Sequence, residues 1–181
     1  MATVTVRTPA GAEAGDVELA DEIFGVQPHV PVMHQVVTAQ LATRRAGTQS
    51  TKTRAEVRGG GVALGPKPRS YAQRTPKKMI RLALLSALSD RAAEGKVVVV
   101  DGWGWDSPKT ASAKAALEAL SLDGRILVVL SDEDVNAALS FRNLPEVQLL
   151  LVGELNAYDV LCNDWIVFTR ETLPKVTEES K

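Results

Sequence analysis

The residues with the clearest chemical capability are eleven Lys and Arg side chains gathered between positions 44 and 81. This stretch, called the basic segment below, contains one acidic residue, Glu56, whereas the other 143 of the 181 residues hold ten basic and 21 acidic ones. The formal net charge of −1 therefore joins a segment of +10 to a body of −11. So strong a cationic stretch in an otherwise acidic chain indicates a polyanionic partner such as a nucleic acid.

The composition of the basic segment favours phosphate as the group it binds. Arg outnumbers Lys seven to four, and guanidinium groups bind phosphate with two hydrogen bonds and stack on bases. The glycine triplet 59–61 allows backbone amides to approach a ligand closely. RNA is preferred over DNA because the segment has no groove-reading helix motif, and irregular basic arms commonly become ordered against folded RNA. Short hydroxyl donors accompany the cations: Thr48, Ser50, Thr51, Thr53, Ser70 and Tyr71.

Other residue types that carry chemistry are sparse. The two histidines, His29 and His34, have no Asp or Glu at ligand spacing, so neither a metal site nor a histidine-based nucleophilic triad is expected. The single cysteine, Cys162, lies in an apolar turn and is interpreted as a packed thiol. The stretch 60–65 resembles a phosphate-binding loop, but Pro66 occupies the place of the required lysine. No cofactor is predicted.

The basic segment lies between two predicted helices. Apolar positions recur at helical spacing over residues 32–45, including Met33, Val36 and Leu41, and Gly47 ends that helix. Residues 48–75, called the loop below, show no period and are broken by glycines and prolines. A second helix begins at Pro76 with Thr75 as its cap and with Met79, Leu82, Ala83, Leu85 and Leu88 directed inward.

The remaining elements predict an α/β fold. Strands are expected at 3–7, 96–101, 125–130, 147–152 and 165–169, with residues 17–19 forming a small hairpin with the first strand. Helices are expected at 108–120, 133–141 and 155–161. Short apolar strands alternating with helices indicate an open, mostly parallel, doubly wound (Rossmann-like) sheet with helices on both faces. One domain over residues 1–181 is expected, with the loop as an excursion from it.

Polar residues at the strand ends raise a rival hypothesis, a nucleotide-dependent α/β enzyme. These residues are Asp101, Ser131, Asp132, Glu154 and Asp164. Helix capping explains most of them, with Ser131 or Asp132 before one helix, as Ser107 stands before Pro108 in another. Trp103 and Trp105 are interpreted as a lid packed over the sheet edge in preference to a stacking platform.

Nothing in the sequence predicts export or membrane insertion. The first residues lack the apolar run of a signal peptide, and no stretch approaches the roughly 20 apolar residues of a membrane span. The expected location is the cytoplasm.

Several strings resemble a known family. They are 51–61 (TKTRAEVRGGG), 65–71 (GPKPRSY), 75–79 (TPKKM), 34–37 (HQVV), 142–145 (RNLP) and 155–161 (LNAYDVL). In family order and over nearly the whole chain, they resemble bacterial large-subunit ribosomal protein four. One departure stands out: Gly61 passes directly to Val62, where family members carry a further basic stretch of a few tens of residues.

The resemblance implies a structural constituent of the large ribosomal subunit and no catalysis. Its partners would be large-subunit ribosomal RNA and neighbouring ribosomal proteins, with the loop directed toward the nascent-peptide exit tunnel. Some members also bind their own messenger's leader, so an off-ribosome translational repressor is a second alternative. The missing part of the loop is the portion expected to reach the tunnel. The RNA-binding residues would be Arg44, Arg45, Lys52, Arg54, Arg58, Gly59, Gly60, Gly61, Lys67, Arg69, Tyr71, Arg74, Lys77, Lys78 and Arg81.

Overall fold

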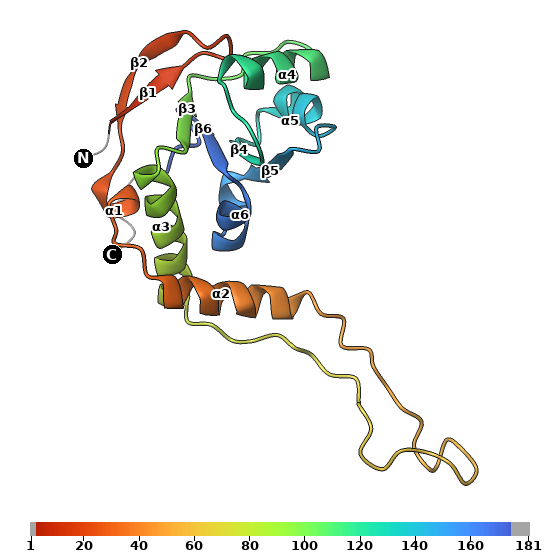
Figure 1. Ribbon diagram of the computed structural model, residues 1–181. Coiled ribbons are helices and arrows are strands. Elements are labelled where there is room, and N and C mark those ends of the chain that lie inside the picture. Colours follow the sequence, from red (N-terminus) through yellow and green to blue (C-terminus); the bar gives the residue numbers. More distant parts are fainter. Residues whose placement is uncertain (1–2, 175–181) are drawn as a thin grey trace.

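Six strands form a single sheet in the order β2-β1-β3-β6-β4-β5, in which only β2 is antiparallel to its neighbour. The computed structural model describes residues 3–174. The strands are β1 (Thr3–Arg7), β2 (Glu13–Glu18), β3 (Val97–Val100), β4 (Ile126–Leu130), β5 (Val147–Leu151) and β6 (Trp165–Thr169). This sheet confirms the predicted α/β class (Figure 1).

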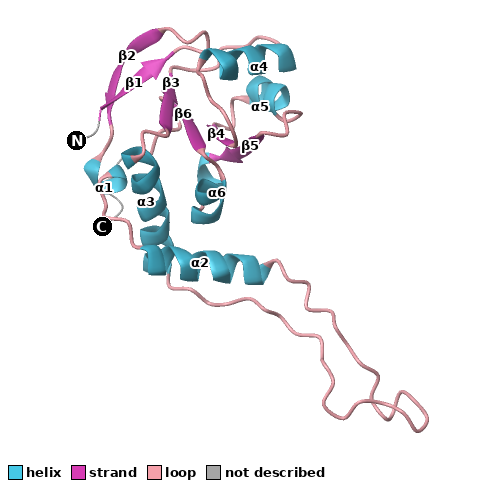
Figure 2. Ribbon diagram, viewed as in Figure 1, coloured by secondary structure: helices cyan, strands magenta, loops and turns pink. Residues whose placement is uncertain are grey.

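Helices cover both faces of the sheet (Figures 1 and 2). They are α1 (Asp21–Phe24), α2 (Val30–Thr43), α3 (Lys77–Ala93), α4 (Thr110–Ala119), α5 (Val135–Phe141) and α6 (Ala157–Cys162), with a 3-10 turn η1 (Val152–Glu154) after β5. Residues 44–76 connect α2 to α3 without helix or strand, as predicted for the loop.

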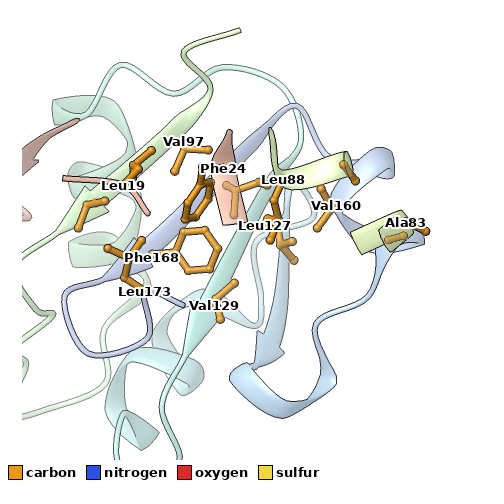
Figure 3. Close-up of a cluster of buried hydrophobic side chains, with 14 of the residues drawn as sticks. Leu19, Phe24, Ala83, Leu88, Val97, Leu127, Val129, Val160, Phe168 and Leu173 are labelled. Atoms are coloured by element: carbon orange, nitrogen blue, oxygen red, sulfur yellow. The ribbon is translucent and has the colours of Figure 1, made fainter. Parts of the chain in front are cut away.

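The central strands divide their side chains between two cores. Val97 and Val99 of β3, with Phe168 of β6, pack against α1, α2, α3 and α6 (Figure 3). Val98 and Val100 face the opposite side and pack against α4 and α5. Successive side chains of a strand point to opposite faces of the sheet. Because helices cover both faces, all four β3 residues are buried. The continuous apolar runs of the sequence are therefore strands buried on both sides.

The predicted helix caps are wrong in three places. The residue before α3 is Pro76, not Thr75; α4 follows Lys109, and α5 follows Asp134. None of these residues caps its helix through its side chain, although Asp134 accepts a hydrogen bond from the backbone N–H of Ser131. Each helix begins one or two residues later than predicted. The start of a helix depends on where the backbone first adopts helical geometry, and a suitable capping side chain alone does not determine that position.

Leu82, predicted to face inward, is exposed, and so is Leu41, one of the apolar positions at helical spacing. Leu41 of α2 is 42% exposed and Leu82 of α3 is 36% exposed. In Figure 1, α2 extends past α3 toward the loop, so its last turns lie beyond the part of α2 that packs on α3. The hairpin is longer than predicted, because β2 begins at Glu13 and pairs with β1 along its whole length.

The two tryptophans after β3 pack as predicted rather than forming an open platform. Trp103 is 3% exposed, and its ring lies edge-on to Phe141 with centroids 4.7 Å apart. Trp105 lies 5.3 Å from Trp103. They cover the α4 and α5 side of the sheet rather than its edge. Within residues 3–174, no helix is long and apolar enough to cross a bilayer.

Candidate nucleic-acid interface

The part of the basic segment between α2 and α3 forms an arm that projects away from the acidic body, and the rest of the segment lies at its base on α3 (Figures 1 and 2). Arg44 and Arg45 directly follow α2, while Lys77, Lys78 and Arg81 occupy the first turns of α3. The six other cations lie on the loop between them. All eleven cationic residues are exposed. Leaving Arg81 aside, none of them is paired with a carboxylate in the part of the chain that the structure describes.

The two halves of the loop run antiparallel near the body. The backbone N–H of Arg69 donates to the carbonyl of Gly47 at 3.1 Å, and that of Thr51 donates to Pro66 at 3.2 Å. Gly47 has φ +64°, and a Cβ there would overlap the carbonyl oxygen of Arg69. Only glycine allows both this backbone conformation and this close approach. The loop therefore has a defined neck, formed by residues 45–51 and 66–71.

An aromatic ring joins the two halves at the neck. The Cζ atom of Arg45 lies 4.0 Å from the centre of the Tyr71 ring, and the Cζ atom of Arg69 lies 3.9 Å from it. Both distances are well inside the range in which a guanidinium is attracted to an aromatic face. The structure thus brings together three of the predicted RNA-binding residues.

The one acidic residue of the basic segment folds the tip of the loop. Glu56 accepts hydrogen bonds from the backbone N–H of Thr53 at 2.7 Å and from its hydroxyl at 3.1 Å. These bonds, led by the backbone one, lower the pKa of the Glu56 carboxyl below its usual value of 4.5. Gly61 packs against the backbone of residues 52–54. The carboxylate thereby organises the turn that precedes the glycine triplet.

A cavity of about 260 Å³ opens between the two halves of the loop near its tip. Arg54 and Lys67 bring cations to it, and Thr51 and Thr53 bring hydroxyl groups. Hydroxyl donors beside cations suit the oxygens of a phosphate or a sugar. Of the glycine triplet, Gly59 and Gly61 have positive φ angles and Gly60 does not.

A polar network that the sequence analysis missed holds the base of the arm. The amide of Gln40 on α2 donates to Asn156 at 3.0 Å, and Asn156 donates to Asp159 at 2.5 Å. Gln148 of β5 donates to the other oxygen of Asp159 at 2.8 Å and accepts from Asn163 at 2.9 Å. Asp159 is 6% exposed, so these bonds satisfy a buried carboxylate.

The same region holds the first cation of the arm. The Cζ atom of Arg44 lies 4.8 Å from the ring centre of Tyr158 on α6. The string 155–161, remote in sequence from the basic segment, therefore caps α6 with Asn156 and fixes the end of α2 from which the arm starts. In the sequence, only the resemblance of residues 155–161 to the family indicated that they matter for supporting the base of the arm.

The carboxyl ends of the strands, where an α/β enzyme would bind its ligand, are occupied by the chain itself. The hydroxyl of Thr172 accepts from the N–H of Thr169 at 2.8 Å and donates to the carbonyl of Val129 at 3.2 Å. Both threonines are buried. Asp101 forms an ion pair with Arg170 at 2.9 Å.

The other strand-end residues do not form a nucleotide site either. The cavity beside Ser131 and Asp132 measures only about 130 Å³, too small for a nucleotide. Asp164 precedes β6 and accepts from the N–H of Arg125, so it lies at the opposite edge of the sheet from the one predicted. The two cavities above 400 Å³ also lie at that amino-terminal edge. No cluster of potential metal ligands occurs within residues 3–174.

Comparison with known proteins connects this architecture to one family. A sequence model described as the Ribosomal protein L4/L1 family matches residues 17–61 and 57–179. A relative from Corynebacterium efficiens, named large ribosomal subunit protein uL4, is 46% identical over 198 residues, which cover 94% of this chain and 91% of the relative. Proteins of the same name from Mycolicibacterium smegmatis and Thermobifida fusca are each 45% identical and cover 94% and 93% of this chain, and 92% and 89% of their own length.

The alignments also show that the relatives have positions that this chain lacks. Since 94% of 181 residues is about 170, the 198 aligned positions include about 28 that this chain lacks. The family model matches in two pieces that meet at residues 57–61, next to the junction of Gly61 with Val62. Both observations agree with the predicted absence of a few tens of residues from the middle of the loop.

Proposed function

Because this chain belongs to the Ribosomal protein L4/L1 family, we propose that it is a structural constituent of the large ribosomal subunit that binds ribosomal RNA through the basic segment. One observation carries the RNA-binding part: eleven exposed cationic residues lie on an arm that projects from an acidic body and at the base of that arm. The family is one of structural proteins rather than enzymes, and as a ribosome component the protein works in the cytoplasm.

The arm suits a phosphate backbone for physical reasons. Its cations repel one another unless an anion neutralises them, and its lone carboxylate is already engaged with Thr53. The body carries the opposite charge and is repelled by RNA, so it stays on the outer side, where it can contact neighbouring proteins. The residues proposed to form the RNA-binding surface are the fifteen named from the sequence, of which Arg44 is also packed on Tyr158.

The location follows from the same resemblance. The loop points toward the nascent-peptide exit tunnel, but it lacks about 28 positions relative to its relatives. Two antiparallel stretches of 14 residues span up to about 45 Å, so the arm reaches correspondingly less far. A photo-crosslinker in place of Leu64, which is 97% exposed, should therefore label ribosomal RNA and not the nascent chain. Labelling of the nascent chain would contradict this placement.

Salt dependence tests the RNA-binding role. The logarithm of the affinity for a large-subunit ribosomal RNA transcript should fall linearly with the logarithm of salt concentration, by about 0.7 to 0.9 per phosphate neutralised. Arg58→Ala should reduce that slope by about one contact. Lys114→Ala, which removes a body lysine paired with Glu118, should leave it unchanged. A slope near zero for the unaltered protein would overturn the proposal.

A second role, binding of the protein's own messenger leader, would use the same cations. The two roles differ in where the protein is found, on the ribosome or off it. Co-sedimentation with large subunits is expected for a ribosomal constituent. A protein that works only as a repressor would bind the leader and remain in the supernatant.

A further inference from the structure

The neck of the loop holds two like charges close together without an anion between them. The Cζ atoms of Arg45 and Arg69 are each about 4 Å from one ring centre, so they lie at most 7.9 Å apart, the sum of the two distances. This is within about one screening length at physiological salt, so the two guanidinium groups repel each other. Neither is paired with a carboxylate among residues 3–174.

Tyr71 supplies the attraction that offsets this repulsion. An aromatic face attracts a guanidinium through its quadrupole, and the two Cζ atoms lie over the Tyr71 ring at 4.0 and 3.9 Å, a spacing that suits stacking of the flat guanidinium on the ring. The N–H groups of a guanidinium lie in its plane and point outward from its edge. Stacking on Tyr71 therefore leaves the donors of both arginines available for another group.

The backbone places the three side chains together within the chain itself. The bond from Arg69 to Gly47 and the bond from Thr51 to Pro66 align the two halves of the neck. The overlap that any side chain at position 47 would make with Arg69 shows how closely the halves approach. The arrangement is thus formed without RNA, and its ordering does not have to accompany binding.

We propose that Tyr71 holds Arg45 and Arg69 as a preformed binding site for phosphate groups of the RNA backbone. The inference rests on the proposed RNA-binding function and specifies how the neck performs it. Preorganisation raises affinity because the side chains lose little freedom on binding. The ring itself is engaged by the protein's own arginines, so it positions them and does not stack on a base.

Substitutions of Tyr71 test the proposal without altering any charge. Tyr71→Phe keeps the ring and should bind the ribosomal RNA transcript within about twofold of the unaltered protein. Tyr71→Leu removes the ring and should weaken binding about three- to tenfold, since two arginines must then be ordered on binding. The salt slope should be the same for all three proteins, because the same phosphates are neutralised.

Combined variants distinguish positioning from direct contact. Tyr71→Leu and Arg69→Ala should be strongly non-additive in the full-length protein, because each removes the same site. Tyr71→Leu and Arg74→Ala should be additive, since Arg74 has no cation–π contact with the ring among the described residues. Thermal unfolding should be unchanged in every variant, because the neck lies outside both cores.

The outcomes separate this inference from the function beneath it. Unaltered binding by Tyr71→Leu overturns the inference and leaves RNA binding intact. Equal losses in Tyr71→Phe and Tyr71→Leu would assign the effect to the hydroxyl group and overturn it as well. Additive losses with Arg69→Ala would indicate that the ring contacts RNA by itself. Failure of the unaltered protein to bind the RNA overturns the proposed function.

Discussion

Thr53 donates two hydrogen bonds to Glu56, one from its backbone and one from its hydroxyl. The only carboxylate of the basic segment thus stabilises a turn in the loop instead of pairing with a cation. Its position explains why one negative charge persists among eleven positive ones: the charged form is the better acceptor for both donors.

The turn at Glu56 should open in acid. The pKa of the Glu56 carboxyl is lowered in the folded state. The stability that this carboxylate contributes is therefore complete above pH 4.5 and is lost as the pH falls through the lowered pKa. The amide NMR shift of Thr53 should follow that titration and should lose it in Glu56→Gln. The amide of Ala72, which donates to the Ser70 hydroxyl, is the control and should not titrate with it.

Gly47→Ala should disorder the neck without unfolding the body. The substitution forces an alanine into a left-handed conformation and against the carbonyl of Arg69. Hydrogen exchange at the Arg69 amide should accelerate and RNA affinity should fall. Gly59→Ala is a matched control for the hydrogen-exchange measurement, because Gly59 also has a positive φ but has nothing within 4 Å of the added carbon. Equal effects of the two variants would show that close approach at the neck is unimportant.

Asn156→Ala should destabilise the body by about 1 to 3 kcal/mol. It removes the cap of α6, the acceptor for Gln40 and one donor to the buried Asp159. Urea unfolding measures the loss. Asn143→Ala changes an exposed asparagine whose side chain makes no hydrogen bond among the described residues, and should change stability by less than about 0.5 kcal/mol.

Thr172→Val should cost about 1 to 3 kcal/mol in the free energy of unfolding. The two side chains have nearly the same shape, but valine leaves the buried N–H of Thr169 without its acceptor. Thr38→Val removes a hydroxyl that donates within the exposed surface of α2 and should have little effect. A similar loss of stability in both variants would show that the buried hydrogen bond to the N–H of Thr169 is not the cause.

The strands were predictable from sequence and the caps were not. Residues 97–100 are all valine, and residues 126–130 are all apolar and mostly β-branched, which is typical of strands buried on both faces. A cap depends on where the backbone turns into the helix, so Thr75 and Ser107 have suitable side chains at unsuitable positions. β2 contains weak strand formers such as Gly15 and Asp16, and its pairing with β1 extends it beyond the predicted residues.

The candidate interface could be predicted from charge alone, whereas the contacts that support it could be identified only from the fold. Cations are visible in any sequence, and all eleven proved to be exposed. The contact of Arg44 with Tyr158 and the bond of Gln40 to Asn156 join residues more than 100 positions apart, so no local pattern could predict them. The meeting of Arg45 and Arg69 on Tyr71 likewise depends on the reversal of the loop.

The length of the arm has little thermodynamic consequence for the body. The connection between Thr43 and Lys77 has 33 residues, and a relative with about 28 more has less than twice that length. Loop-closure entropy grows with the logarithm of length, at about 0.6 kcal/mol per doubling. Docking of α2 on α3 is therefore almost equally favourable with either arm. The middle of the loop can be lost or gained without compensating changes in the packed core, so its length is free to follow the demands of assembly alone.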